Sequence, residues 1–239
     1  GQWIASRGVR DQVVIATKVA KSSSRPGLSA ANIAVAADES LTRLGIDTID
    51  LYYAHEDDQT VDQVDTMTAF SALVTAGKVR TIGASNFTAE RIASALAICA
   101  ARGLTAFSAV QPEFNVIARS DYEGDLADLC VARDLACHPY YALARGLLTG
   151  KHTRQRLADS VRAEDIAEVA TDHAWDIVDI VRSVADKHHT SMAAVALAWL
   201  RTQPGVASPI ASVRTPAQLA DLLAPVTLDR GDLDLLTAG

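Results

Sequence analysis

The sequence has little of what several classes of protein require. Its 239 residues include only three cysteines, Cys99, Cys130 and Cys137, which have no CxxC spacing. We therefore expect reduced thiols, a cytoplasmic location and no metal site. No apolar run reaches about 18 residues, so no membrane span is expected. The net charge is -7 and no basic stripe is visible, so we expect no nucleic-acid partner.

What the sequence does contain is an alternation of short apolar runs and amphipathic stretches. The runs predicted as strands are 13–16, 49–53, 78–83, 107–110, 135–138 and 208–211. The predicted helices are 29–44, 61–76, 88–102, 122–133, 172–187, 191–202, 216–223 and 231–238, and residues 2–6 are predicted as the last turn of another. The polar stretch 151–171 is predicted as a long loop. The first five strands begin about 30 residues apart with one helix between each pair, which is typical of βα units around a parallel sheet.

This spacing favours an α/β fold of the TIM (β/α)8 barrel type over a flavodoxin-like open sheet, which needs only five or six strands. We expect residues 1–239 to form a single domain. A full barrel has eight strands, so we expect the first two βα units, on the order of 60 residues, to be missing before Gly1. The chain has no initiator methionine, and residues 2–6 read as a helix remnant.

Polar side chains stand at the carboxyl end of each predicted strand. They are Lys18, His55, Ser85 with Asn86, Gln111, Tyr140, and Ser212 with Arg214. A single polar strand end has a simple structural explanation, such as a hydrogen-bonded histidine at position 55. Six in succession predict a site on this rim, because a barrel builds its active site from the loops that follow its strands.

Seven segments closely resemble the aldo-keto reductase family, in particular a bacterial branch that also resembles potassium-channel β-subunits. Among them are LGIDTIDLY at 44–52 with His55, GKVRTIGASNF at 77–87, VQPEFN at 110–115 and LARGLLTGK at 143–151. The others lie at 13–18, 195–200 and 214–219. They occur in the family's order and span essentially the whole chain.

The resemblance implies hydride transfer between a nicotinamide cofactor and a carbonyl group, without a Rossmann GxGxxG motif. Of the family's four catalytic residues, Lys18 matches the lysine that lowers the pKa of the proton-donating tyrosine, and His55 matches the histidine that orients the carbonyl oxygen. The family's aspartate and tyrosine have no match in residues 1–239, so we expect this chain alone not to reduce carbonyls at a useful rate. A substitute acid would have to be Tyr53, Tyr140 or Tyr141.

The resemblance also implies a nucleotide site. The matching residues are Ser85, Asn86 and Gln111 for the nicotinamide carboxamide, Tyr140 for the ring, Leu143, Ala144, Gly146 and Lys151 for the pyrophosphate, and Ser212, Arg214, Gln218 and Asp221 for the adenosine phosphate. An arginine at the adenosine end favours NADP(H) over NAD, because a guanidinium fork suits a 2′-phosphate. Tyr140 has a second interpretation as a core aromatic, and Arg162 is either a second phosphate contact or a solvated side chain.

Two departures from the family pattern affect this site. The family's Ser-Pro after the stacking tyrosine is Tyr141-Ala142 here, and an adenine-contacting asparagine is Leu222. The favoured interpretation is an NADP(H)-dependent reductase of aldehydes or ketones, with a small-molecule carbonyl substrate, and a monomer is favoured. One alternative is a non-catalytic nucleotide-binding or regulatory module, and another is a structural fragment without function.

Overall fold

The computed structural model describes residues 1–157 and 163–238, and Arg162 lies outside them. The chain divides into two compact units, residues 1–111 with 132–136 and residues 112–131 with 137–239. Each unit is described by itself. The predictions of a single domain and of a closed barrel remain predictions.

The first unit is built on a parallel sheet. Its strands are β1 (Ala16–Val19), β4 (Ile49–Ala54), β5 (Val79–Ser85) and β6 (Phe107–Gln111), and β7 (Ala136–Cys137) follows β6 in the order β1-β4-β5-β6-β7. This order follows the chain in one direction. A flavodoxin-like sheet would instead place its first strand inside the order, so the observed sequence of strands favours a barrel wall. A small hairpin, β2 (Lys21–Ser22) and β3 (Arg25–Pro26), forms a separate sheet.

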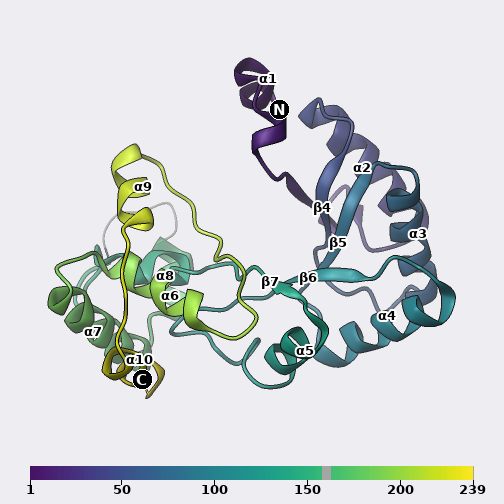
Figure 1. Ribbon diagram of the computed structural model, residues 1–239. Helices are drawn as coiled ribbons and strands as arrows, with labels where there is room; N and C mark the ends of the chain where they lie inside the picture. The colour runs from purple at the N-terminus through teal and green to yellow at the C-terminus, as the bar shows by residue number, and fades with distance from the viewer. Residues whose placement is uncertain (158–162, 239) are drawn as a thin grey trace. The chain divides into compact units, whose positions relative to one another are not determined.

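Helices α2 (Ala30–Leu44), α3 (Gln63–Thr75) and α4 (Ala89–Arg102) cover one face of this sheet (Figure 1). The side chains of Ser29 and Thr88 cap α2 and α4, and Gly45 and Gly103 end them with a φ of 65°. Before the sheet come α1 (Gln2–Arg7), which Gly8 ends, and the short 3₁₀ helix η1 (Arg10–Gln12). The capped helices confirm the sequence prediction to within about one residue.

The packing shows which strand side chains face the helices. The ring of Tyr52 on β4 lies 5.7 Å from that of Phe70 on α3, and Phe70 lies 6.3 Å from Phe107 on β6. Tyr52 therefore points toward the helices. Because side chains alternate along a strand, Leu51 and Tyr53 point to the opposite face.

The strand predicted at 13–16 is wrong in its bounds and in its burial. The structure has the strand at Ala16–Val19, and the side chain of Val14 is 78% exposed. β1 pairs only with β4 among the described residues, and this partner, rather than the local apolar run, decides where the strand begins. As a result Lys18 lies inside β1 instead of following it.

The second unit is mainly helical. Its 3₁₀ helix η2 (Ala144–Thr149) is followed by α6 (Ala163–Val169), α7 (Asp172–Lys187), α8 (Met192–Thr202), α9 (Pro216–Leu223) and α10 (Arg230–Ala238), while α5 (Asp125–Arg133) spans the boundary between the units. Every residue of α8 from Met192 to Leu200 is buried, and the Trp199 ring packs 5.4 Å from Phe114. The helix α8 is therefore the core element of this unit.

Two predictions for the second unit are wrong. The stretch 151–171 is not one long loop, because α6 lies within it. Residues 208–211 do not form a strand, although the backbone N–H groups of Ala207 and Ile210 donate to Cys137 and Pro139, both at 2.9 Å. These two backbone hydrogen bonds hold the segment beside the end of β7, but they do not form a regular β-ladder.

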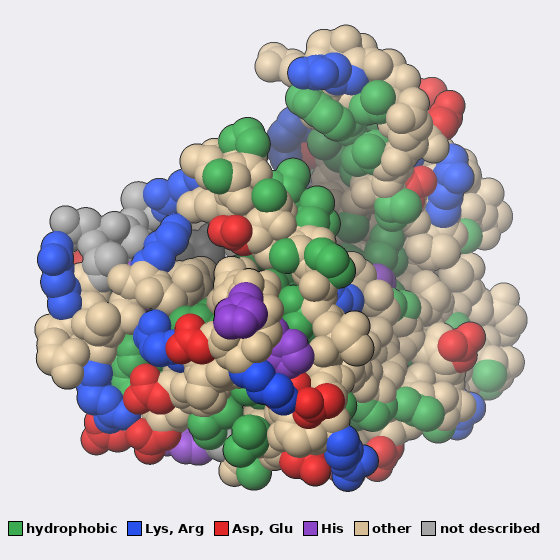
Figure 2. All heavy atoms as spheres, turned by 60° about the vertical axis from the view of Figure 1, so that its left-hand side comes forward, with side chains coloured by type: hydrophobic (Ala, Val, Ile, Leu, Met, Phe, Trp, Pro, Cys, Tyr) green, Lys and Arg blue, Asp and Glu red, His purple; other side chains and the backbone are tan. Residues whose placement is uncertain are grey.

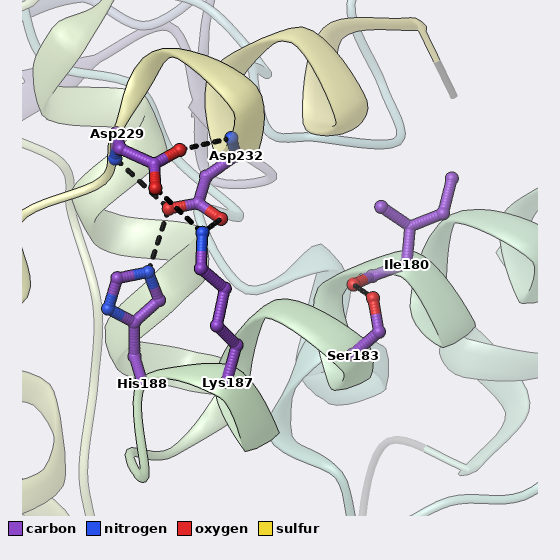
Figure 3. A network of polar contacts seen from close by, with 6 residues as sticks. All are labelled: Ile180, Ser183, Lys187, His188, Asp229 and Asp232. Carbon is purple, nitrogen blue, oxygen red and sulfur yellow. Dashed lines mark hydrogen bonds and ion pairs between the residues drawn. The ribbon is translucent and has the colours of Figure 1, made fainter.

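A buried carboxylate fastens α10 to the end of α7 (Figure 3). The side chain of Asp232, 2% exposed, accepts hydrogen bonds from Lys187 Nζ at 2.8 Å and the backbone N–H of Asp229 at 3.0 Å, and lies 2.7 Å from His188 Nε2. Asp229 in turn accepts from the backbone N–H of Asp232 at 2.9 Å. This reciprocal pair is a capping box, and it fixes where α10 begins.

Acidic and basic side chains lie next to one another on the face drawn in Figure 2. The second unit contributes exposed ion pairs of this kind, such as Arg154 with Asp172 at 2.9 Å and with Asp176 at 2.7 Å. Pairs as exposed as these contribute about 0–1 kcal/mol each. Among the described residues no helix is both long and apolar enough to cross a membrane.

Candidate functional site

In the first unit the predicted site residues gather at one edge of the sheet. Lys18 pairs in register with Tyr53, and Ser85 pairs with Gln111. His55 follows β4 and continues the ladder, since its backbone N–H donates to Val19 at 2.8 Å. By strand alternation from Tyr53, the side chains of Lys18 and His55 share the face opposite the helices. The carboxyl ends of parallel strands lie at one edge, so Lys18 and His55 lie close together there.

The pKa values of both side chains are lowered, and the charge of Lys18 contributes to the lowering at His55. Partial burial lowers the pKa of Lys18, and the nearby Lys21 lowers it further. Partial burial also lowers the pKa of His55, with additional lowering by the charges of Lys18 and Lys21 against an opposing effect of Glu56. The imidazole of His55 is therefore neutral at pH 7, and one ring nitrogen carries a hydrogen that can be donated to a carbonyl oxygen.

Two polar side chains, those of Ser85 and Asn86, tie together the ends of β4, β5 and β6. The Ser85 hydroxyl donates to the carbonyl oxygen of Gln111 at 2.7 Å, and the Asn86 amide donates to the carbonyl oxygen of His55 at 2.8 Å. Asn86 also donates to Ser85 Oγ at 3.2 Å and has a φ of 56°, a conformation that asparagine tolerates better than most residues. These hydroxyl and amide groups are of the kinds that pair with a carboxamide.

Gly83 makes room for a tyrosine on this face. A Cβ at this position would lie 2.5 Å from Cε1 of Tyr53 and 2.9 Å from the carbonyl oxygen of Ala109. Only glycine fits under the Tyr53 ring. The side chain of Tyr53 is itself 1% exposed, which makes it a poor substitute for an acid that must reach a substrate.

In the second unit, Tyr140 begins a sharply bent loop that runs to Lys151. The Tyr140 backbone N–H donates to Pro112 at 3.0 Å, and the loop then takes positive φ angles at Tyr141 (51°), Ala144 (45°), Arg145 (58°) and Gly146 (119°). Left-handed non-glycine residues cost on the order of 1–3 kcal/mol each and cluster at functional sites. The predicted pyrophosphate residues Leu143, Ala144 and Gly146 all lie in or beside this bend, and Lys151 is exposed where it ends.

Sequence reasoning missed two residues of this loop. His152 is 3% exposed, and its Nε2 would lie 3.9 Å from a Cβ at Gly146. Burial lowers the pKa of His152, and Lys151 lowers it further. Arg145 lies with its guanidinium 4.8 Å from the centre of the Tyr141 ring. The feature of the sequence that could have identified His152 is its position directly after Lys151, a residue predicted to bind the pyrophosphate.

The residues predicted to hold the adenosine phosphate lie around the start of α9. Thr215 caps the helix, Pro216 is its first residue, and the Gln218 side chain accepts from the backbone N–H of Arg214 at 2.8 Å. Ser212, Arg214 and Asp221 are exposed. A helix start favours negative charge, and an exposed guanidinium beside it adds two-pronged hydrogen bonding.

Of the residues predicted for the site, Lys18, His55, Ser85, Asn86 and Gln111 belong to the first unit, and those of the 140–151 loop and around α9 belong to the second. Within the part of the chain described, no three His, Cys, Asp or Glu side chains are grouped as a metal ion would require.

The model of the aldo/keto reductase family matches residues 1–238. The chain is a member of this family. An aldo-keto reductase of Fusarium vanettenii is 34% identical over 84% of this chain and 54% of its own length. An uncharacterized oxidoreductase of Bacillus subtilis is 31% identical over 99% of this chain and 74% of its own length. A probable voltage-gated potassium channel β-subunit of Arabidopsis thaliana is 28% identical over 96% of this chain and 76% of its own length.

Membership confirms the resemblance seen in the sequence, including that to potassium-channel β-subunits. The family is one of oxidoreductases with an α/β TIM-barrel fold, and its members generally use nicotinamide cofactors on small carbonyl compounds. The chain spans little more than half of the Fusarium relative.

Proposed function

We propose that this chain is part of an NADP(H)-dependent reductase that converts aldehydes or ketones to alcohols. The observation that carries the proposal is the meeting of Lys18 and His55 on one face and edge of the sheet, beside the hydrogen-bonded group of Ser85, Asn86 and Gln111. The cytoplasmic location and the monomeric state remain predictions.

The residues present suit a nicotinamide nucleotide. The amide of Asn86 and the hydroxyl of Ser85 offer both donors and acceptors for a carboxamide, and Asn86 is exposed. Among the described residues no ion pair neutralises Arg214, which leaves its charge for a phosphate. The bound nucleotide would supply the hydride.

The chain's own groups would handle the carbonyl oxygen. The neutral His55 would donate a hydrogen bond to this oxygen and hold it in place. The cation of Lys18 would stabilise negative charge that develops on the oxygen and would lower the pKa of a neighbouring phenol that donates the proton. The interactions of both groups would strengthen as negative charge develops on the oxygen, so each should affect turnover more than substrate affinity.

Nucleotide titration tests the cofactor. NADPH should bind more tightly than NADH, as measured by nicotinamide fluorescence. Arg214→Ala should weaken NADPH binding by about 10- to 100-fold, the effect of losing a charge-assisted hydrogen bond, and should leave NADH binding unchanged. Arg230→Ala is the matched control, because Arg230 is an exposed arginine paired with Asp234 on α10. Equal affinities for the two nucleotides in the wild-type protein would overturn the NADP(H) assignment.

A second candidate is a non-catalytic nucleotide-binding or regulatory module. It is favoured by one observation, the 28% identity to a probable voltage-gated potassium channel β-subunit of Arabidopsis thaliana over 96% of this chain. The two candidates differ in outcome. A module of this kind binds NADPH and shows no carbonyl-dependent oxidation of it, whereas the reductase shows both.

A further inference from the structure

Three side chains of the second unit form a continuous stack. The ring of Tyr140 lies 5.0 Å from that of Tyr141 at an interplanar angle of 69°, an edge-to-face arrangement. The guanidinium of Arg145 lies 4.8 Å from the centre of the Tyr141 ring. Both geometries are attractive, because the edge of a ring and a cation are each drawn to the negative face of an aromatic ring.

The far end of the stack is anchored by charge. Arg145 lies 3.9 Å from Glu113, the residue whose backbone is bridged to that of Tyr140, and 3.1 Å from Glu168 on α6. The side chains of Arg145 and Glu113 are only 20% and 18% exposed. The buried Asn115 also holds the loop, since its amide donates to the carbonyl oxygen of Tyr141 at 3.0 Å. Tyr141 is therefore fixed through both its ring and its backbone.

This arrangement is maintained at a cost. Tyr141 and Arg145 both have left-handed backbones, and among the described residues the buried Nε of Arg145 has no hydrogen-bond partner. Strain and an unpaired donor persist only where the surroundings determine the conformation. The position after the stacking tyrosine is also where this chain departs from the family, with Tyr141-Ala142 in place of Ser-Pro. The loop has lost the rigidity of a proline and has gained a ring.

We propose that Tyr141 and Arg145 are positioning residues that hold the ring of Tyr140 in the orientation in which it lies against the nicotinamide. The stack does the work that the proline does in the family pattern, by limiting the rotation of Tyr140. This inference rests on the proposed function for the role of Tyr140, but the stack itself can be tested without any nucleotide.

Hydrogen exchange of the nucleotide-free protein tests the stack. The amides of Ala144 and Gly146 report on it, because they donate within the bend to Tyr141 and Leu143 at 2.7 and 2.9 Å. Tyr141→Ser and Arg145→Met should each speed their exchange by about tenfold, the effect expected from losing one such contact. Tyr141→Phe keeps the ring and should exchange like the wild type. Arg154→Met removes an arginine paired elsewhere and should also have no effect. Wild-type exchange in Tyr141→Ser would overturn the proposal.

Binding of nucleotides with and without the nicotinamide tests the orientation of Tyr140. In Tyr141→Ser and Arg145→Met the affinity for NADPH should fall by about tenfold, whereas the affinity for 2′-phospho-ADP-ribose, which keeps the pyrophosphate but lacks the nicotinamide, should not change. An equal loss for both nucleotides would show a general effect on the loop and overturn the positioning role. If the wild-type protein binds neither nucleotide, the proposed function fails, and the exchange rates still decide whether the stack holds the loop.

Discussion

The chemistry of His55 depends on neighbours that come from other parts of the chain. Burial, Lys18 on β1 and Lys21 on β2 all lower the pKa of its imidazole. Alternation along β4 was enough to predict the face on which His55 lies, because a strand has a period of two residues. The register with β1, which brings Lys18 beside Tyr53, is a tertiary fact that no local pattern contains.

Removing one of these neighbours should raise the pKa of His55. In Lys18→Met the cationic neighbour is lost, so the pKa should move back toward the ordinary value of 6.5. NMR titration of the ring hydrogens measures this directly. Lys151→Met, a change in the second unit, is the control and should leave the titration unchanged. An unshifted pKa in Lys18→Met would contradict the effect of Lys18 and leave burial and Lys21 as the causes of the lowering.

The same shift determines how stability responds to acid at this site. Folding lowers the pKa of His55, so the unfolded chain takes up a proton at higher pH than the folded chain does. The free energy of unfolding at this site therefore falls as the pH drops through 6.5 toward the lowered pKa.

At the scale of elements, the sequence predicted the helices better than the strands. The sequence marks both ends of α2 and of α4. Helix α2 begins after the capping hydroxyl of Ser29 and ends at Gly45, and α4 begins after that of Thr88 and ends at Gly103. Strand β1 was misplaced because its limits depend on pairing with β4. Helix α6 was missed because a periodic pattern needs several buried apolar residues. Among the residues of α6 whose burial is described, only Ile166 is apolar and buried.

The contact between α7 and α10 depends on the charge of Asp232. Burial is the largest single effect on the pKa of Asp232 and raises it, but the hydrogen bonds from Lys187, His188 and Asp229 and the charge of Lys187 together lower it to about 2. A carboxylate with a lowered pKa stabilises the folded state above its unfolded pKa, so about 2 kcal/mol should be present at pH 7 and lost between about pH 4 and pH 2.

We therefore expect Asp232→Asn to destabilise α10 at pH 7 by about 2 kcal/mol, because His188 loses its carboxylate partner and Lys187 keeps only Asp229. Hydrogen exchange of the α10 amides measures this local free energy. The control is Asp234→Asn on the same helix, whose side chain is 63% exposed and should matter by less than about 0.5 kcal/mol. A difference between Asp232→Asn and the wild type that persisted unchanged at pH 2 would contradict the electrostatic explanation.

At the scale of the whole molecule, the even spacing of strands predicted the observed order. Each βα unit adds its strand beside the previous one, which gives β1-β4-β5-β6 in chain order with α2, α3 and α4 on one face. The sequence could not predict the division into two compact units, because it depends on contacts between distant segments. The same limit applies to the site, whose residues were found by motif while the Arg145–Tyr141–Tyr140 stack was not.

The catalytic capacity of the 239-residue chain follows from which groups it contains. Lys18 and His55 meet at the sheet edge, but in the roles proposed for them Lys18 lowers the pKa of a phenol and His55 orients the carbonyl, so neither is the proton donor. Tyr53 is buried, and burial and nearby acidic groups raise the pKa of Tyr140 to about 12, which makes it a weaker acid. Without a positioned acid the proton must come from water, and a rate factor of about 10² to 10⁴ is lost.

We therefore expect residues 1–239 to oxidise NADPH with a panel of aldehydes at least about 10²-fold more slowly than a fusion that adds the family's aspartate and tyrosine. The added segment can come from the Bacillus subtilis relative, whose match covers 99% of this chain. A fusion in which that tyrosine is phenylalanine is the matched control, and it should be as slow as residues 1–239, because it restores the added strands without the acid. Equal rates for the 239-residue chain and the complete fusion would refute the expectation and identify Tyr53, Tyr140 or Tyr141 as the proton donor to be tested next.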